Sequence, residues 1–290
     1  MPTKSEKDAL TGRETTGHEW DGIRELNNPL PKWWLYILLA TIVWALVWFV
    51  LYPSIPLGRT YFKGLLGYST RTEVDRGVEA MHARHADATA KIAVLAPAEI
   101  RKDPQLAAVA QVAGRIAFAN NCAPCHGPSG QGQAGYPNLA DDVWLWGGKL
   151  DDIQQTITYG IRSGNAQARV ADMPRFGVDQ LLTPAQIEQV ADYVMVLYGM
   201  PVAGADTAPG EKLFADNCAA CHGEKGQGNR DVGAPPLASK VHLYGNDRAT
   251  VVRQVAQPRE GVMPAWTGRL DPATIKSLAL YVHALGGGEE

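Results

Sequence analysis

Apolar residues recur at helical spacing in two segments of this 290-residue chain, one after residue 183 and one after residue 271. The segment that begins at Thr183-Pro184 has Gln186 at the capping-box position, and its apolar residues lie on one helical face. Asp271-Pro272 opens a second helix of the same kind. The apolar positions are Ile187, Val190, Ala191, Val194 and Leu197 in the first helix, and Ile275, Leu278, Ala279 and Val282 in the second.

Two further helices are predicted earlier in the chain, and together these patterns indicate a mostly α protein. One is an alanine-rich helix from Glu73 to Leu95, which Pro97 ends. The other runs from Gln105 to Asn121. His82 and His85 lie on one face of the first helix, but no cysteine or carboxylate cluster accompanies them, so we expect surface histidines.

The longest apolar stretch is Trp33 to Tyr52, twenty residues without a charge. As a helix, this stretch would span about 30 Å, the thickness of the hydrocarbon core of a bilayer. A cleavable signal peptide would have a shorter apolar region nearer the start, followed by a small-residue cleavage site. Here a polar segment of 32 residues precedes the apolar stretch. We therefore predict a retained transmembrane helix over residues 33–52.

All four cysteines lie in two copies of the sequence Cys-x-x-Cys-His, each inside a longer repeat. Asn121 to Gly132 matches Asn217 to Gly228 at nine of twelve positions. Further pairs of matching positions are Gly114 with Gly210, Phe118 with Phe214, Met173-Pro174 with Met263-Pro264, and Leu182 with Leu270. The chain therefore contains a tandem duplication of a module of roughly 85–95 residues.

Cys-x-x-Cys-His is the attachment signature of c-type haem, in which two thiols bond to the porphyrin and the next residue binds the iron. We predict two covalently bound haem c groups, on Cys122 and Cys125 and on Cys218 and Cys221. His126 and His222 are then axial ligands of the iron. A zinc site would need one compact ligand cluster and would leave both histidines without a role. Structural disulfides would have to close a very short loop twice.

The sixth ligand of each iron decides what the haems can do, because methionine raises the reduction potential and closes the site to substrates. Met263 is the one methionine after His222, 41 residues on, and the repeat alignment selects Met173, 47 residues after His126. Met195 and Met200 are the other methionines between His126 and the second module, and Met200 follows a predicted helix stop at Gly199. Met195 lies in an apolar helical pattern, which is typical of a core residue.

Two histidines compete with methionine as ligands of the second iron. They are His242, which aligns with Trp144, and His283, which aligns with the Val-Met-Val stretch of the first module. Since neither is repeated, we expect both on a surface or against a haem propionate.

These modules resemble class I cytochrome c domains, and the whole chain is similar to the dihaem cytochrome c subunit (subunit III) of cbb3-type cytochrome c oxidases. Beyond the haem motifs, the resemblance rests on Asp21 to Trp34 and on Leu66-Gly-Tyr68, and it covers residues 17–285. It implies one N-terminal transmembrane helix followed by two tandem class I cytochrome c-like all-α haem domains. By that likeness, one haem is held by Cys122, Cys125, His126 and Met173, and the other by Cys218, Cys221, His222 and Met263.

The resemblance implies that this chain transfers electrons and is not catalytic on its own. A soluble or membrane-bound donor cytochrome c would reduce it, and it would pass electrons towards a monohaem cytochrome c subunit and a catalytic subunit with haem b and copper. No nucleic-acid partner is expected. A free membrane-anchored dihaem shuttle, serving another oxidase or a dehydrogenase, is the alternative. A dihaem peroxidase or a haem-based sensor would need an iron with an open or displaceable ligand.

Orientation follows from haem chemistry, because three Lys/Arg residues lie in the twenty positions on each side of the span. Covalent haem is installed on the periplasmic side in bacteria, so the chain is expected in the inner membrane as a single-pass protein. The predicted organisation is a cytoplasmic segment 1–32, the span 33–52, a periplasmic connecting region 53–113, a first haem domain 114–199, a linker 200–209 and a second haem domain 210–290.

Overall fold

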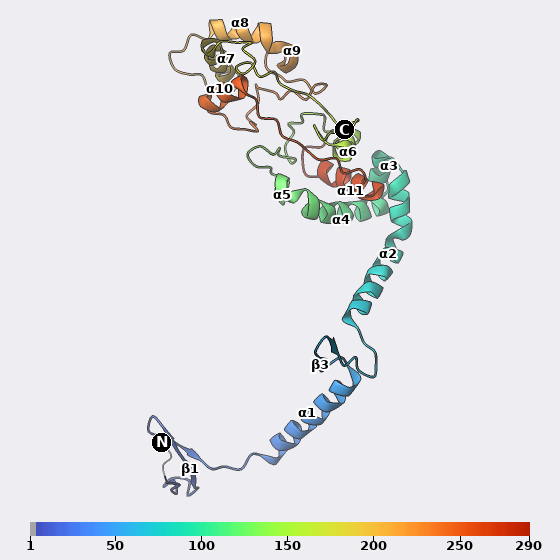
Figure 1. Cartoon of the computed structure of the whole chain (residues 1–290), viewed down its shortest axis with the longest axis vertical. Coiled ribbons are helices and arrows are strands. Elements are labelled where there is room, and N and C mark those ends of the chain that lie inside the picture. Colours follow the sequence, from blue (N-terminus) through green and yellow to red (C-terminus); the bar gives the residue numbers. More distant parts are fainter. Residues whose placement is uncertain (1–3) are drawn as a thin grey trace. The chain divides into compact units, whose positions relative to one another are not determined.

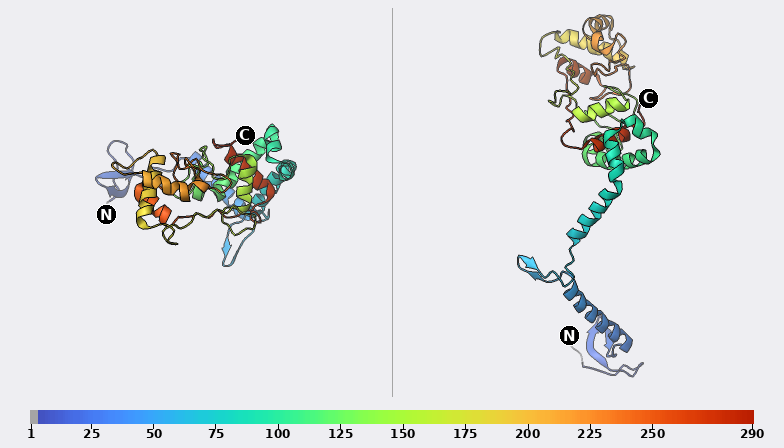
Figure 2. Two further views of the ribbon diagram at one scale, coloured as in Figure 1. Left: turned by 90° about the horizontal axis from the view of Figure 1, so that it is seen from above. Right: turned by 90° about the vertical axis from the view of Figure 1, so that its right-hand side faces the viewer.

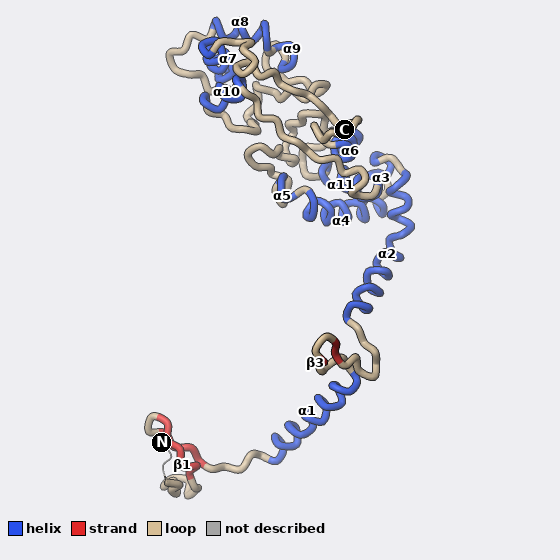
Figure 3. Tube along the Cα trace, viewed as in Figure 1, coloured by secondary structure: helices blue, strands red, loops and turns tan. Residues whose placement is uncertain are grey.

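The computed structural model describes residues 4–290, which form two compact units (Figure 1). The first unit ends at His82, and the second runs from Ala83 to Glu290. Helices joined by long loops make up most of the second unit (Figure 3). The predicted mostly α fold is confirmed.

The first unit contains two short hairpins that the sequence analysis did not predict. Strands β1 (Thr15–Trp20) and β2 (Ile23–Leu26) pair antiparallel. Asp21 and Gly22 join them, both with positive φ, as a two-residue hairpin turn requires. Strands β3 (Pro56–Leu57) and β4 (Thr60–Tyr61) form the second pair.

Helix α1 (Lys32–Leu51) confirms the helix predicted over residues 33–52. No residue between Lys32 and Leu51 is buried, and the mean hydropathy of its most apolar window is 2.3. Within residues 4–290, α1 is the one helix long and apolar enough to cross a membrane. Helix α2 (Thr70–Val94) agrees with the predicted alanine-rich helix, and His82 and His85 are exposed on it.

The second unit contains nine more helices among its described residues. The predicted helical segments at 105–121 and after Thr183 and Asp271 are all confirmed, and the capping box at Thr183 and Gln186 is formed. The helices are α3 (Pro97–Lys102), α4 (Pro104–Asn121), α5 (Ala123–His126), α6 (Leu150–Tyr159), α7 (Pro184–Leu197), α8 (Ala208–Asn217), α9 (Ala219–His222), α10 (Arg248–Ala256) and α11 (Pro272–His283).

These helices form two lobes (Figures 1 and 2). Helix α11, from the end of the chain, packs against α4 and α6. Helix α7 packs against α8 and α10. We call α4, α5, α6 and α11 the first-motif lobe, because it carries Cys122-x-x-Cys125-His126. The second-motif lobe consists of α7, α8, α9 and α10 and carries Cys218-x-x-Cys221-His222.

Each lobe is built on the same close helix crossing, and a glycine makes each crossing possible. A methyl group at Gly114 of α4 would collide with the carbonyl oxygen of Ser277 in α11. A methyl group at Gly210 of α8 would collide in the same way with the carbonyl oxygen of Gln189 in α7. The equivalent phenylalanines pack against tyrosines of the partner helices with tilted rings, whose centroids are 5.3 Å apart for Phe118–Tyr281 and 5.4 Å for Phe214–Tyr193.

The two lobes therefore exchange their closing helices. The predicted domains 114–199 and 210–290 are continuous in sequence, whereas each lobe takes its closing helix from the other repeat. The chain leaves the first-motif lobe after Arg169, which is bonded to α6, and returns to it after α10. We call residues 170–174 the first crossover and residues 260–264 the second crossover.

Candidate haem sites

Each Cys-x-x-Cys-His motif forms one short helical turn at the end of a longer helix. Cys122 ends α4, and the backbone amides of Cys125 and His126 donate to its carbonyl oxygen at 3.1 and 2.9 Å. Cys218 ends α8 in the same way, and the amides of Cys221 and His222 donate to it at the same distances. This turn brings both cysteines and the histidine of a motif close together.

A backbone carbonyl orients each motif histidine. His126 Nδ1 lies 3.0 Å from the carbonyl oxygen of Pro137, and His222 Nδ1 lies 3.0 Å from that of Pro235. A carbonyl only accepts, so Nδ1 carries the proton and Nε2 keeps its lone pair for a metal. Burial lowers the pKa of both rings, against the raising effect of these hydrogen bonds, which favours the neutral form that binds iron.

The thiols differ between the lobes in exposure. Cys122 and Cys125 are half-buried, whereas Cys218 is buried and Cys221 is exposed. Burial, with a smaller contribution from the neighbouring cysteine, raises the pKa of Cys122 and of Cys218 to about 11. Within residues 4–290 every cysteine is a free thiol, so all four are available to a covalent cofactor.

The two predicted methionine ligands lie with the opposite motifs. Met263 packs against the buried cluster of the first-motif lobe, as Cys122 and Leu139 do. Met173 packs against the buried cluster of the second-motif lobe, which includes Cys218 and contacts Leu237. The pairing expected from the resemblance, Met173 with His126 and Met263 with His222, stays a prediction, as does the question whether each methionine serves its own module. The two crossovers carry each methionine out of its own repeat and against the core of the other lobe.

The other residues considered as ligands have different surroundings. Met195 is 5% exposed and belongs to the second-motif core, as predicted. Met200 is exposed and receives a weak hydrogen bond from the Asn246 amide. His242 stacks on Tyr198 with ring centroids 3.8 Å apart, and His283 Nε2 lies 2.8 Å from the carbonyl oxygen of Glu289. In residues 4–290, no three His, Cys, Asp or Glu side chains gather as a metal-binding group would require.

In donor chemistry the two sites fit haem c. Each site offers two thiols, an imidazole with a free Nε2 and a thioether among apolar side chains, a set that matches covalent haem with histidine and methionine ligands.

Comparisons with known proteins agree with this donor set. Three family models match the chain: "N-terminal domain of cytochrome oxidase-cbb3, FixP" at residues 12–59, "Cytochrome c" at 111–197, and "Cytochrome C oxidase, cbb3-type, subunit III" at 205–282. A cbb3-type cytochrome c oxidase subunit FixP from Bradyrhizobium sp. (strain ORS 278) is 50% identical over 290 residues, covering 100% of both chains. The chain belongs to the FixP/CcoP family of cbb3-type cytochrome c oxidase subunits.

Further members of the family are similarly close. The CcoP subunit from Azospirillum sp. (strain B510) is 53% identical over 98% of each chain, and that from Cereibacter sphaeroides is 48% identical over 100% of each chain. As a family member, the chain is a membrane-anchored electron-transfer subunit of a cbb3-type oxidase and carries two covalently bound haem c groups. The predicted family, function and cofactor are confirmed.

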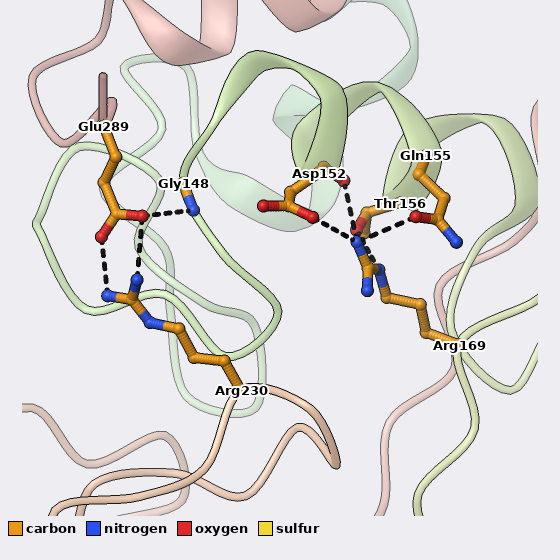
Figure 4. Close-up of polar contacts among 7 residues, drawn as sticks. All are labelled: Gly148, Asp152, Gln155, Thr156, Arg169, Arg230 and Glu289. Atoms are coloured by element: carbon orange, nitrogen blue, oxygen red, sulfur yellow. Dashed lines mark hydrogen bonds and ion pairs between the residues drawn. The ribbon is translucent and has the colours of Figure 1, made fainter.

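Two arginines that sequence reasoning missed link loops of the second unit to other segments (Figure 4). Arg169 lies over the ring of Trp146 at 5.3 Å and bonds to Asp152, Gln155 and Thr156 of α6. Arg230, in the loop after α9, forms a two-pronged ion pair with Glu289 near the C-terminus, at 2.6 and 2.9 Å. An arginine four residues before each methionine (Arg169 and Arg259) was a readable signal, since both lie over aromatic rings.

Proposed function

We propose that His126 and Met263 are the axial ligands of the haem bound to Cys122 and Cys125. His222 and Met173 then serve the haem bound to Cys218 and Cys221. The observation that supports this pairing is the packing of each methionine against the buried cluster of the opposite motif. Each haem is thus held by residues of both repeats.

Two side-chain ligands leave no open position for a substrate, so this chain works as a relay and is not catalytic on its own. When bound, each haem supplies a one-electron Fe(III)/Fe(II) couple. Histidine Nδ1–H donation to a carbonyl holds the imidazole plane and increases its basicity towards iron. The thioether ligand favours the reduced state, which raises the reduction potential. Apolar residues around each methionine exclude water from the site.

The remaining features concern the membrane and the partners. Helix α1 anchors the chain in the bacterial inner membrane, with residues 1–32 in the cytoplasm and the haem lobes in the periplasm. Since no residue of α1 is buried, its sides can contact lipid and the helices of other subunits. The partners are the catalytic subunit with haem b and copper, the monohaem cytochrome c subunit and a donor cytochrome c.

The orientation of the chain is tested by fusions to alkaline phosphatase. The enzyme fused after Glu290 should be active, and fused after Leu30 it should be inactive.

The ligand pairing is tested in chains that bind a single haem. Cys218→Ser with Cys221→Ser leaves only the first haem. In that background, Met263→Leu should abolish the methionine-to-iron charge-transfer band and lower the reduction potential by more than roughly 0.1 V, within the range of about 0.8 V that axial ligands span. Met173→Leu is the matched control, since leucine keeps the volume of methionine, and it should leave the band in place. The reverse pattern would mean ligation within each repeat.

Membership of a complex is tested by affinity purification of the tagged chain from native membranes in mild detergent. Co-purified haem b and copper, with cyanide-sensitive oxygen uptake from a reduced donor cytochrome, are the expected result. Recovery of c-type haem without oxygen uptake would instead indicate a free membrane-anchored shuttle.

A further inference from the structure

The two crossovers, which carry the two methionines, lie side by side in the second unit. The backbone of Ile161, just after α6, pairs with Met263 through two hydrogen bonds of 3.0 Å. On its other side Ile161 forms a bridge with Arg169, the residue before the first crossover. Neither crossover belongs to a helix, so their positions depend on such contacts with neighbouring segments.

Arg162, the residue after Ile161, bonds to both crossovers at once. Its Nε donates to the carbonyl oxygen of Gly261 at 2.9 Å, and its Nη1 donates to that of Ala171 at 2.8 Å. Each of these carbonyls lies two residues before a methionine, Met263 in one case and Met173 in the other. One planar guanidinium therefore fixes the distance between equivalent points of the two methionine segments.

The backbone of Arg162 supports this role. Its φ is +50°, a left-handed conformation that is unfavourable for a residue with a side chain. Such a conformation persists when the surroundings hold it, and it is found preferentially at functional positions. In this conformation the Arg162 side chain bonds to a carbonyl of each crossover.

A second contact ties one methionine to the opposite crossover. The backbone amide of Met173 donates to the carboxylate of Glu260 at 2.6 Å, a short hydrogen bond to a charged acceptor. Glu260 lies three residues before Met263 in the second crossover. The position of Met173 thus depends directly on the segment that carries Met263.

We propose that Arg162 and Glu260 are positioning residues that couple the two axial methionines, so that both irons share one determinant of their Fe–S bonds. We call this pair of residues the crossover clasp. The proposal rests on Met173 and Met263 being the ligands, as given under the proposed function. It implies that a change at Arg162, which contacts no haem-attaching cysteine or histidine among the described contacts, alters both haem sites together.

The test measures how readily imidazole displaces methionine from the ferric iron, in the two single-haem backgrounds. Arg162→Gln should increase the affinity for imidazole about tenfold at both haems, the factor that loss of one charge-assisted hydrogen bond corresponds to. The methionine charge-transfer band and the reduction potential should fall at both. Arg101→Gln removes the same charge from an exposed pair with Glu290 and should change neither haem.

Three further variants separate geometry from charge. Arg162→Lys keeps the charge but cannot serve both carbonyls, so it should still weaken the bands; unchanged bands would mean that charge alone acts. Glu260→Ala should loosen Met173 and affect mainly the second-motif haem, whereas Glu260→Gln retains an acceptor oxygen and should preserve both bands. If Arg162→Gln accumulates poorly, as judged by covalent haem content, Arg162→Lys and Glu260→Ala decide the question.

The outcomes distinguish this inference from the ligand assignment. Bands that vanish in the methionine variants but are unchanged in all clasp variants overturn the clasp and leave the ligands correct. Bands that survive both methionine variants overturn the ligand assignment itself. An effect of Arg162→Gln at one haem alone would also overturn the coupling.

Discussion

The two lobes contain equivalent helix crossings but differ in the helices and buried clusters around these crossings. In the first-motif lobe, α4 has 18 residues and crosses α11 at Gly114, whereas in the second-motif lobe α8 has only 10 residues and crosses α7 at Gly210. In each lobe the partner helix belongs to the other repeat. Both repeats have therefore kept the same contact between helix faces. In each contact, however, one of the two helices comes from the other repeat.

The first-motif lobe also has a second layer of buried side chains. The end of α2, α3 and the start of α4 form a further apolar cluster with α11, which includes the fully buried Ile100. Lys276 of α11 donates to the carbonyl oxygens of Ala93 and Leu95 at 2.8 and 2.6 Å and so ties α2 to this lobe. The second-motif lobe has one buried cluster. We infer that the first-motif lobe is the more stable of the two.

The largest expected effect comes from separating the repeats. A fragment of residues 97–199 keeps the first motif but lacks α11, so the buried faces of α4 and α6 lose their partner. Exposing that core should cost more than the 5–15 kcal/mol by which a domain of this size is stable. We expect this fragment to be unfolded by circular dichroism and to show no methionine charge-transfer band.

A crossed chain is the matched control for that fragment. Residues 97–169 joined by a short glycine linker to residues 262–290 should fold and carry one haem with histidine and methionine ligands. The join is short because Arg169 and Met263 lie on either side of Ile161, about 10 Å apart at the usual strand spacing. A crossed chain that fails to fold, beside a folded 97–199 fragment with a methionine-ligated haem, would contradict the exchange of helices.

A smaller effect is expected at the glycines of the two crossings. Gly114→Ala and Gly210→Ala each place a methyl group against a backbone carbonyl, which cannot move as a side chain could. Overpacking of this kind destabilises by about 1–3 kcal/mol. We expect a larger fall in the melting temperature of the second-motif lobe with Gly210→Ala than of the first-motif lobe with Gly114→Ala. The melting of each lobe is followed by the absorbance of its own haem in single-haem chains.

A control glycine is available in Gly77 of α2, where an added methyl group meets nothing within 4 Å. Gly77→Ala should be neutral or slightly stabilising, because alanine has the higher helix propensity. Equal losses for Gly114→Ala and Gly210→Ala would remove the inferred difference in stability between the lobes.

Local signals in the sequence predicted most of the helices, because helix caps and apolar faces depend on residues that lie close together in the sequence. The proline and capping box at Thr183, the repeat with its cysteines and the uncharged stretch of α1 all belong to this class. Asp21-Gly22 was an equally local hairpin signal that the sequence analysis did not use. The exchange of helices is different in kind. Both closing helices present the same apolar face, so the pattern cannot tell which motif each one covers.

The smallest predicted effect concerns a polar link between the lobes. Glu289, beside the first-motif lobe, pairs with Arg230 of the second-motif lobe and accepts from the Gly148 amide at 3.0 Å (Figure 4). Partial burial by itself raises the pKa of Glu289, but the hydrogen bonds from Arg230 and Gly148 outweigh it and bring the pKa below its usual 4.5. A lowered folded-state pKa means that the ionised form stabilises the fold at higher pH.

This link should contribute up to about 1 kcal/mol at neutral pH, since both side chains are partly exposed. The contribution is complete above the unfolded-state pKa, near 4.5, and is lost as the pH falls through the lower folded-state value. Urea unfolding of Glu289→Gln against the parent chain should therefore show a difference at pH 7 that disappears under more acidic conditions. Glu79→Gln, at an exposed position of α2, is the matched control. A Glu289→Gln difference that persists at acid pH would assign the effect to packing of the C-terminal residues instead of to the ion pair between the lobes.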